Sequence, residues 1–147
     1  MDILFHAATS AMLANQLGER RPRQLILAAT LGVVPDVVHA AGLCAGIRVY
    51  PLAHSLLLNL PICLAVCLTL NWRIAWGGLL HLAIDTFTHA YSTRDLLYPF
   101  SRSKLFAGID WYQGRGLLLW AALWLLLLTC CAWRWHGRRR EARRSAS

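Results

Sequence analysis

The sequence predicts an all-α protein, a polytopic membrane helix bundle of about four to five hydrophobic helices. Hydrophobic residues make up 57% of the 147 positions and charged residues 15%, whereas soluble domains are about 45–50% apolar. Several long stretches carry no charge, and the clearest is residues 117–133, LLLWAALWLLLLTCCAW. Basic residues gather between these stretches and after residue 133. We therefore expect a membrane-embedded helical domain over residues 1–133 and a basic cytoplasmic tail over residues 134–147.

Three helices are expected in the first half of the chain. Residues 3–17 are helical in composition but shorter than the roughly 20 residues of a full span, which predicts a partly inserted or protein-covered helix. Residues 24–47 are long enough to span, and Pro35 is expected to kink or break them because proline has no backbone N–H. Residues 52–70 form the next predicted span, with a bend at Pro61.

Two further hydrophobic segments are expected in the second half. Residues 74–90 follow a tight turn at 71–73 and predict another span. Residues 91–116 alternate charges, aromatic rings and turn residues, which indicates a loop or short helix at the membrane interface. Residues 117–133 predict the last span.

The placement of charge predicts the orientation of the chain. If each hydrophobic segment reverses the chain, the turns at 18–23 and 71–73 and the tail share one side. They carry three, one and six Lys or Arg residues, ten of the fifteen. The positive-inside rule places this side in the cytoplasm, so we expect a multi-pass protein of the cell inner membrane with a cytoplasmic C-terminus. The juxtamembrane tail is expected to contact anionic lipid, and its position argues against nucleic acid as a partner.

The segment 79–89, LLHLAIDTFTH, carries His81, Asp85 and His89 in an otherwise apolar run. On a helix these three positions spread over only about 80° and share one face. Imidazoles and a carboxylate are costly to bury in an apolar segment unless they have partners. Metal coordination is one explanation, and a pair of satisfied core histidines with a hydrogen-bonded Asp is the other.

The predicted topology brings further donors to the same leaflet, which favours the metal explanation. The expected metal ligands are His6, Asp36, His54, His81, Asp85 and His89, and the first five are the expected catalytic residues. Imidazole and carboxylate together suit zinc, iron or manganese, and zinc is the expected ion. Six ligands suffice for one or two ions, with a bridging carboxylate. His39 is a reserve ligand, and the role of Ser55 stays open between orienting a ligand and ordinary helix packing.

Several short motifs resemble the bacterial membrane-bound metal-dependent hydrolases over about residues 1–100. They are an early His on a short helix, LGVVPD, AHSLL, HLAIDTFTH, and a proline after the last ligand. The matching positions are His6, Pro35, Asp36, His54, Ser55, His81, Asp85 and Pro99. The order of ligand types is also distantly similar to that of zinc-dependent phospholipase C, which implies phosphoester chemistry.

The function expected from these features is a membrane-embedded metal-dependent hydrolase. A metal-activated water would attack a phosphoester or other ester of a lipid-like substrate at the outer face of the inner membrane. Basic residues of the outer loop, Arg94, Arg102, Lys104 and Arg115, would receive an anionic head group or simply lie at the interface. The alternatives are a metal-binding transporter or ion pathway, and a non-catalytic membrane scaffold.

Overall fold

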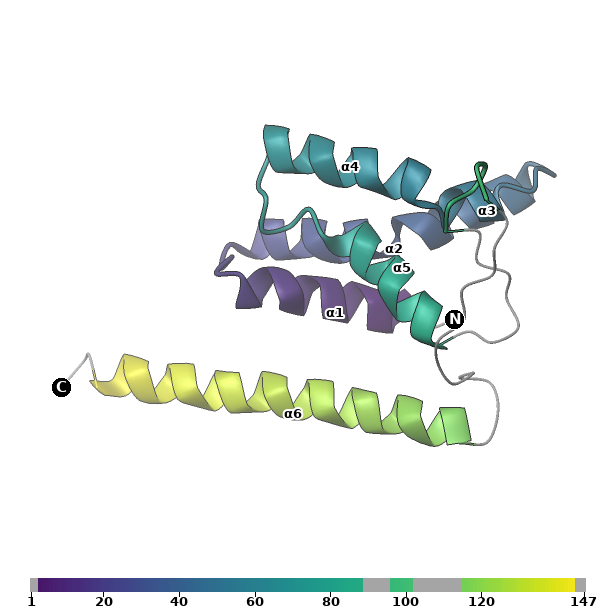
Figure 1. Cartoon of the computed structure of the whole chain (residues 1–147). Coiled ribbons are helices and arrows are strands. Elements are labelled where there is room, and N and C mark those ends of the chain that lie inside the picture. The colour runs from purple at the N-terminus through teal and green to yellow at the C-terminus, as the bar shows by residue number, and fades with distance from the viewer. Residues whose placement is uncertain (1–2, 89–95, 102–114, 145–147) are drawn as a thin grey trace. The chain divides into compact units, whose positions relative to one another are not determined.

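The computed structural model describes residues 3–88, 96–101 and 115–144, and the regular structure in these ranges is entirely helical (Figure 1). The helices are α1 (Ile3–Gln16), α2 (Pro22–Cys44), α3 (Tyr50–Ala53), α4 (Leu56–Thr69), α5 (Gly77–Thr88) and α6 (Arg115–Arg144). The prediction of an all-α protein is confirmed. The chain divides into two units, Met1–Asp110 and Trp111–Ser147, and the candidate site lies in the first.

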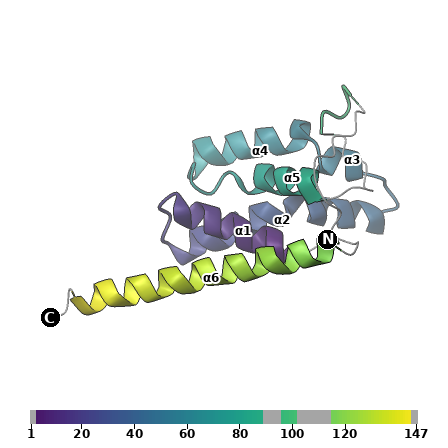
Figure 2. The ribbon, with the colours of Figure 1, turned by 60° about the horizontal axis from the view of Figure 1, so that its bottom comes forward.

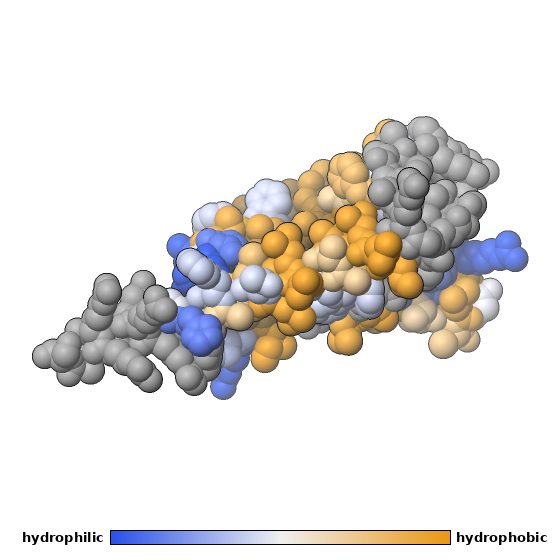
Figure 3. Space-filling view, turned by 90° about the horizontal axis from the view of Figure 1, so that it is seen from below, coloured by the Kyte–Doolittle hydropathy of each residue, from blue (hydrophilic) through white to orange (hydrophobic). Residues whose placement is uncertain are grey.

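Three helical stretches are long and apolar enough to cross a membrane: Pro22–Cys44, Tyr50–Thr69 and Gly116–Arg134. Many large apolar side chains are exposed, and Figure 3 shows apolar residues over much of the visible face. These features indicate a membrane protein. Helices α1 and α5 have 14 and 12 residues, about 21 and 18 Å in length, and are too short for a hydrocarbon core of about 30 Å. The span expected from residue 74 begins only at Gly77, because residues 74–76 form a turn, and the structure describes α5 as far as Thr88.

The structure bears on one of the two proline predictions, the kink or break expected at Pro35. Helix α2 runs without interruption through Pro35, so a break there is excluded, while a kink at Pro35 stays a prediction. Helix α4 likewise continues through Pro61, where the expected bend stays a prediction. The interruption lies instead at His54 and Ser55, between α3 and α4, where Ser55 is extended with φ −107° and ψ 156°. At the other end of the chain, α6 continues to Arg144, so the basic segment after residue 133 is largely an extension of that helix.

The first unit is held together by close contacts of α5 with α1, α2 and α4 (Figures 1 and 2). Gly32 and Gly77 make this approach possible. A Cβ atom at Gly77 would lie 2.7 Å from the Gly32 backbone nitrogen and 3.0 Å from the Ala28 carbonyl oxygen, and one at Gly32 would lie 2.7 Å from the His6 carbonyl oxygen. Small residues that allow backbones to approach are the usual basis of helix packing in membranes. Here they bring the helices of His6 and His81 together.

The substitution Gly77→Ala is expected to destabilise the protein by about 1–3 kcal/mol, because the new methyl group meets backbone atoms that must move apart. The control is Gly137→Ala in α6, where a Cβ atom meets nothing within 4 Å. That substitution is expected to be neutral or stabilising, since alanine is the better helix former. Thermal unfolding in detergent measures both. Equal melting temperatures for Gly77→Ala and the wild type would contradict this packing.

Glu19 joins the turn after α1 to the turn after α4. Its carboxylate accepts hydrogen bonds from the backbone N–H groups of Arg20 and Arg21, at 2.9 and 2.8 Å, and from the Arg21 guanidinium at 3.1 Å. The Asn71 side-chain amide donates another. The Arg21 guanidinium and these N–H groups lower the pKa of Glu19 to about 2, because they favour the charged carboxylate.

The contribution of Glu19 to stability is expected to depend on pH. Because its pKa is lower in the folded protein than the ordinary 4.5, the stabilisation is complete above about pH 4.5 and is lost as the pH falls towards 2. The measurement is the difference in melting temperature between the wild type and Glu19→Gln from pH 7 to pH 3. The difference should shrink as the pH falls. A difference that stays constant would mean that the carboxylate charge is not involved.

Candidate metal centre

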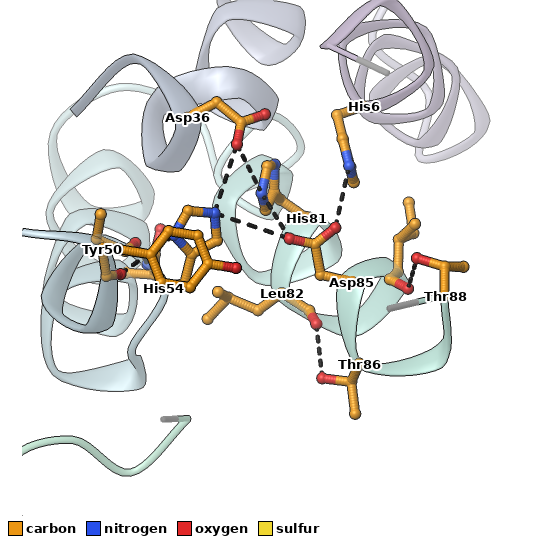
Figure 4. A network of polar contacts seen from close by, with 12 residues as sticks. His6, Asp36, Tyr50, His54, His81, Leu82, Asp85, Thr86 and Thr88 are labelled. Carbon is orange, nitrogen blue, oxygen red and sulfur yellow. Dashed lines mark hydrogen bonds and ion pairs between the residues drawn. The ribbon is translucent and has the colours of Figure 1, made fainter. Parts of the chain in front are cut away.

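Five ionisable side chains from four parts of the first unit meet between α1, α2 and α5 (Figure 4). They are His6 of α1, Asp36 of α2, His54 of the α3–α4 junction, and His81 and Asp85 of α5. Asp36 is 8% exposed and the other four are 2% exposed or less. Buried charges are costly unless they are paired or coordinate a metal, so this cluster requires a compensating charge.

The two carboxylates lie among the three imidazoles. Asp85 Oδ1 is 3.3 Å from His6 Nε2, and Asp85 Oδ2 is 3.1 Å from His81 Nε2 and 3.8 Å from His54 Nε2. Asp36 Oδ1 is 3.4 Å from His54 Nε2 and 3.8 Å from His81 Nε2. Tetrahedral ligands at typical zinc bond lengths are about 3.3 Å from one another. The donor atoms therefore already have roughly the spacing that a shared cation requires.

Two groups of three donors satisfy the spacing of a metal site. One contains His6, His81 and Asp85, the other Asp36, His54 and His81, and in each group the ligand atoms lie within 4.8 Å of one another. His81 belongs to both groups and so lies at the centre of the cluster. Its ring also stacks on that of His6, with centroids 3.9 Å apart.

Backbone carbonyls fix the tautomers of two histidines. His81 Nδ1 lies 2.8 Å from the Gly32 carbonyl oxygen, and His54 Nδ1 lies 3.2 Å from the Tyr50 carbonyl oxygen. A carbonyl oxygen only accepts, so each Nδ1 carries the proton and donates it. In the neutral rings, Nε2 then presents its lone pair towards the carboxylates. Two acceptors face one another stably only when a cation or a proton lies between them.

The contacts of the Nε2 atoms bear on the choice between the cation and the proton. The Nε2 atoms of His54 and His81 have no hydrogen-bond partner within the described residues, although carboxylate oxygens lie only 3.1 to 3.8 Å away. A protonated ring would be expected to direct its N–H at such an oxygen. A shared cation between these atoms would compensate the carboxylates and the Nε2 lone pairs together. The role of the five residues as metal ligands stays a prediction.

Two other candidates from the sequence, His39 and Ser55, are described and do not belong to the five clustered side chains. His39 is half-buried beside it, with its ring centroid 6.2 Å from that of His54. The Ser55 hydroxyl donates to the Leu52 carbonyl oxygen at 2.7 Å, which indicates a structural role at the start of α4. His89, Arg94, Arg102 and Lys104 lie outside the described residues, as does the side chain of Arg115.

Tyr50 and Gly32 contribute to the site although the sequence did not single them out. The Tyr50 ring stacks on His54 with centroids 4.2 Å apart, and its carbonyl holds the same histidine. Its spacing of four residues from His54 would have been a signal, because residues four apart adjoin on a helix. Gly32 has no such signal, since its carbonyl meets His81 49 residues away. Comparisons of the chain with protein-family models, with curated proteins and with solved structures each found no match.

Proposed function

We propose that this protein is a membrane-embedded metal-dependent hydrolase whose metal ligands are His6, Asp36, His54, His81 and Asp85. The observation that carries the proposal is the orientation of His54 and His81. Their Nδ1 atoms donate to backbone carbonyls, while both Nε2 atoms lie 3.1 to 3.8 Å from carboxylate oxygens and have no hydrogen-bond partner of regular geometry in the described part of the chain. Histidines held in this way by an outer partner are typical of metal ligands.

Zinc is the ion that the donor set suits best, because three or four imidazole and carboxylate ligands are usual for zinc. The Nε2 atom of His81 has a single lone pair and can bind only one cation. Asp36, His54 and Asp85 would be the other ligands of that ion. Asp85 is the residue able to bridge to a second ion, since Oδ1 faces His6 while Oδ2 faces His81. Cysteine is not among these ligands, which argues against a closed structural zinc site.

Hydrolysis is the reaction that such a centre favours. A bound divalent cation polarises an ester or phosphoester oxygen and brings the pKa of a bound water near 7. Asp36 is the least buried of the five residues, and its Oδ2, although itself buried, has no hydrogen-bond partner within the described residues. That oxygen is available to accept a proton from the attacking water. The burial of the other four residues excludes bulk water and strengthens the electrostatic interactions.

The lipid-like substrate and the location of the site follow from the membrane helices and the charge distribution. Ten of the fifteen basic residues fall on the predicted cytoplasmic side. This supports an inner-membrane protein with a cytoplasmic C-terminus, a tail on anionic lipid, and a site towards the outer face. A phosphoester or other ester of a lipid is then the substrate class. The resemblance to bacterial membrane-bound metal-dependent hydrolases supports the same reaction, because its motifs contain all five ligands.

Loss of the Asp36 carboxylate is expected to lower ester hydrolysis by about a hundredfold or more, because it removes both a ligand and a proton acceptor. The full chain is purified in detergent, bound metal is measured by mass spectrometry, and hydrolysis is measured with bis(p-nitrophenyl) phosphate and fluorescent lipid esters. Asp36→Asn is compared with Glu19→Gln, which makes the same carboxylate-to-amide change outside the site.

The proposal fails if the purified protein binds no divalent metal, or if hydrolysis continues in the presence of a chelator. Metal-dependent ion flux in proteoliposomes, without hydrolysis of any ester, would favour an ion pathway through the same residues. Full activity of both Asp36→Asn and Glu19→Gln would remove Asp36 from the catalytic site.

A further inference from the structure

An apolar groove runs along the first unit between the end of α1 and the start of α5. It is lined by Leu13, Leu17, Trp72, Trp76, Leu79 and Leu80. Leu17 follows the last residue of α1, and its N–H donates to the Leu13 carbonyl oxygen at 2.9 Å, so the two side chains lie about one helical turn apart along this wall of the groove. Trp72 and Trp76 are 50% and 41% exposed. None of these residues belongs to the metal centre.

One end of this groove carries the cation of Arg73, which forms no ion pair with any acidic side chain that the structure describes. Arg73 lies next to the end of α1, since a Cβ atom at Gly18 would be 3.7 Å from Arg73 Cζ. Its guanidinium also lies 5.8 Å from the Trp72 ring. Arg73 Nε is buried and has no hydrogen-bond partner within the described residues. The nearby carboxylate of Glu19 is already bound by Arg21 and Asn71.

We propose that this groove and Arg73 together form a binding site for one anionic phospholipid, with its phosphate on the Arg73 guanidinium and the upper part of an acyl chain between α1 and α5. The site is independent of the metal centre and of the hydrolase proposal.

Charge complementarity and position favour this occupant over others. A guanidinium that is half-buried with an unsatisfied N–H needs an anion, and phosphate offers several acceptor oxygens to it. Tryptophan and arginine gather at the level of lipid head groups, and below them the groove offers only apolar contacts. A zwitterionic lipid presents the same phosphate together with a cation, which Arg73 repels. The groove is therefore expected to discriminate by net charge.

The test uses the full chain in nanodiscs of phosphatidylcholine that contain a minor fraction of phosphatidylglycerol. In one preparation the phosphatidylglycerol carries brominated acyl chains, and in the other an equal fraction of the phosphatidylcholine does. Brominated chains quench tryptophan fluorescence on contact. Brominated phosphatidylglycerol should quench more than an equal fraction of brominated phosphatidylcholine. The excess should disappear in a variant with Trp72→Phe and Trp76→Phe. Arg73→Gln should reduce the preference about fivefold. Arg48→Gln, an exposed arginine in the turn after α2, is the charge-matched control and should leave the preference unchanged.

Equal quenching by the two brominated lipids would overturn the proposal, as would excess quenching by phosphatidylglycerol that survives loss of both tryptophans. Equal effects of the Arg73 and Arg48 variants on the lipid preference would also overturn it. So would protection of the groove by a second copy of the chain. The last is detected as quenching that falls when two chains are loaded per nanodisc instead of one. The wild type compared with the double tryptophan variant tests occupancy without changing Arg73, so the result does not depend on folding of Arg73→Gln.

Discussion

Replacing His81 with asparagine is expected to strip metal from the protein and to lower ester hydrolysis by about a thousandfold or more. His81 is the residue that the two donor groups share, so its loss removes a ligand from either arrangement. Asparagine is chosen because its amide can still donate to the Gly32 carbonyl, which His81 Nδ1 now binds at 2.8 Å. The substitution therefore removes Nε2 while retaining the contact between α5 and α2.

Bound zinc per chain and the rate of hydrolysis measure this prediction. His136→Asn is the matched control, since His136 is exposed on α6 and its loss should change neither quantity. His39→Asn tests the reserve ligand and should also retain the metal, because that ring lies beside the cluster and 6.2 Å from His54. A His81→Asn protein that folds and keeps its zinc would show that the histidines form an ordinary polar core.

Much of the candidate site could be predicted from spacing and topology. His81 and Asp85 are four residues apart, so any helix places them side by side, and the structure has their donor atoms 3.1 Å apart. His6, Asp36 and His54 were harder to place, because their meeting depends on how the segments turn back in the membrane. The rule that hydrophobic segments alternate in direction was enough to bring them to one depth. It could not specify which oxygen faces which ring.

The parts that could not be predicted depend on tertiary contacts. Pro35 lacks the N–H that would bind the Leu31 carbonyl one turn earlier, yet α2 continues. The Gly32 carbonyl accepts a hydrogen bond from His81, which is a tertiary contact that local sequence does not reveal. The run 74–90 was expected to be a span, whereas α5 begins at Gly77. The apolar side chains of Ile74 and Ala75 are instead buried in the protein, 1% and 2% exposed, in the turn before α5. Hydrophobicity alone does not distinguish a buried turn from a membrane helix.

Removing bound metal with a chelator is expected to lower the melting temperature of the wild-type protein by about 5–10 °C and to leave Asp85→Asn unchanged. A ligand that binds only the folded state stabilises it by about 2.7 kcal/mol at one hundred times its dissociation constant. In a chain of this size, each kcal/mol shifts the midpoint by about 2–4 °C. Asp85→Asn keeps the shape of the side chain but removes the carboxylate that lies near all three histidines.

The same experiment distinguishes a metal centre from a network of buried ion pairs. If protonated histidines neutralise Asp36 and Asp85, a chelator has no effect on the wild type, because no metal contributes to its stability. In that case Asp85→Asn alone costs about 3–5 kcal/mol, since it leaves buried histidine charges without a partner. If a cation holds the cluster together, the loss of stability caused by Asp85→Asn should instead be largest when it is measured against the zinc-bound wild type. The loss should be smaller when it is measured against the wild type without metal. The dependence of the mutational cost on zinc, measured in one detergent at one pH, therefore decides between the two explanations.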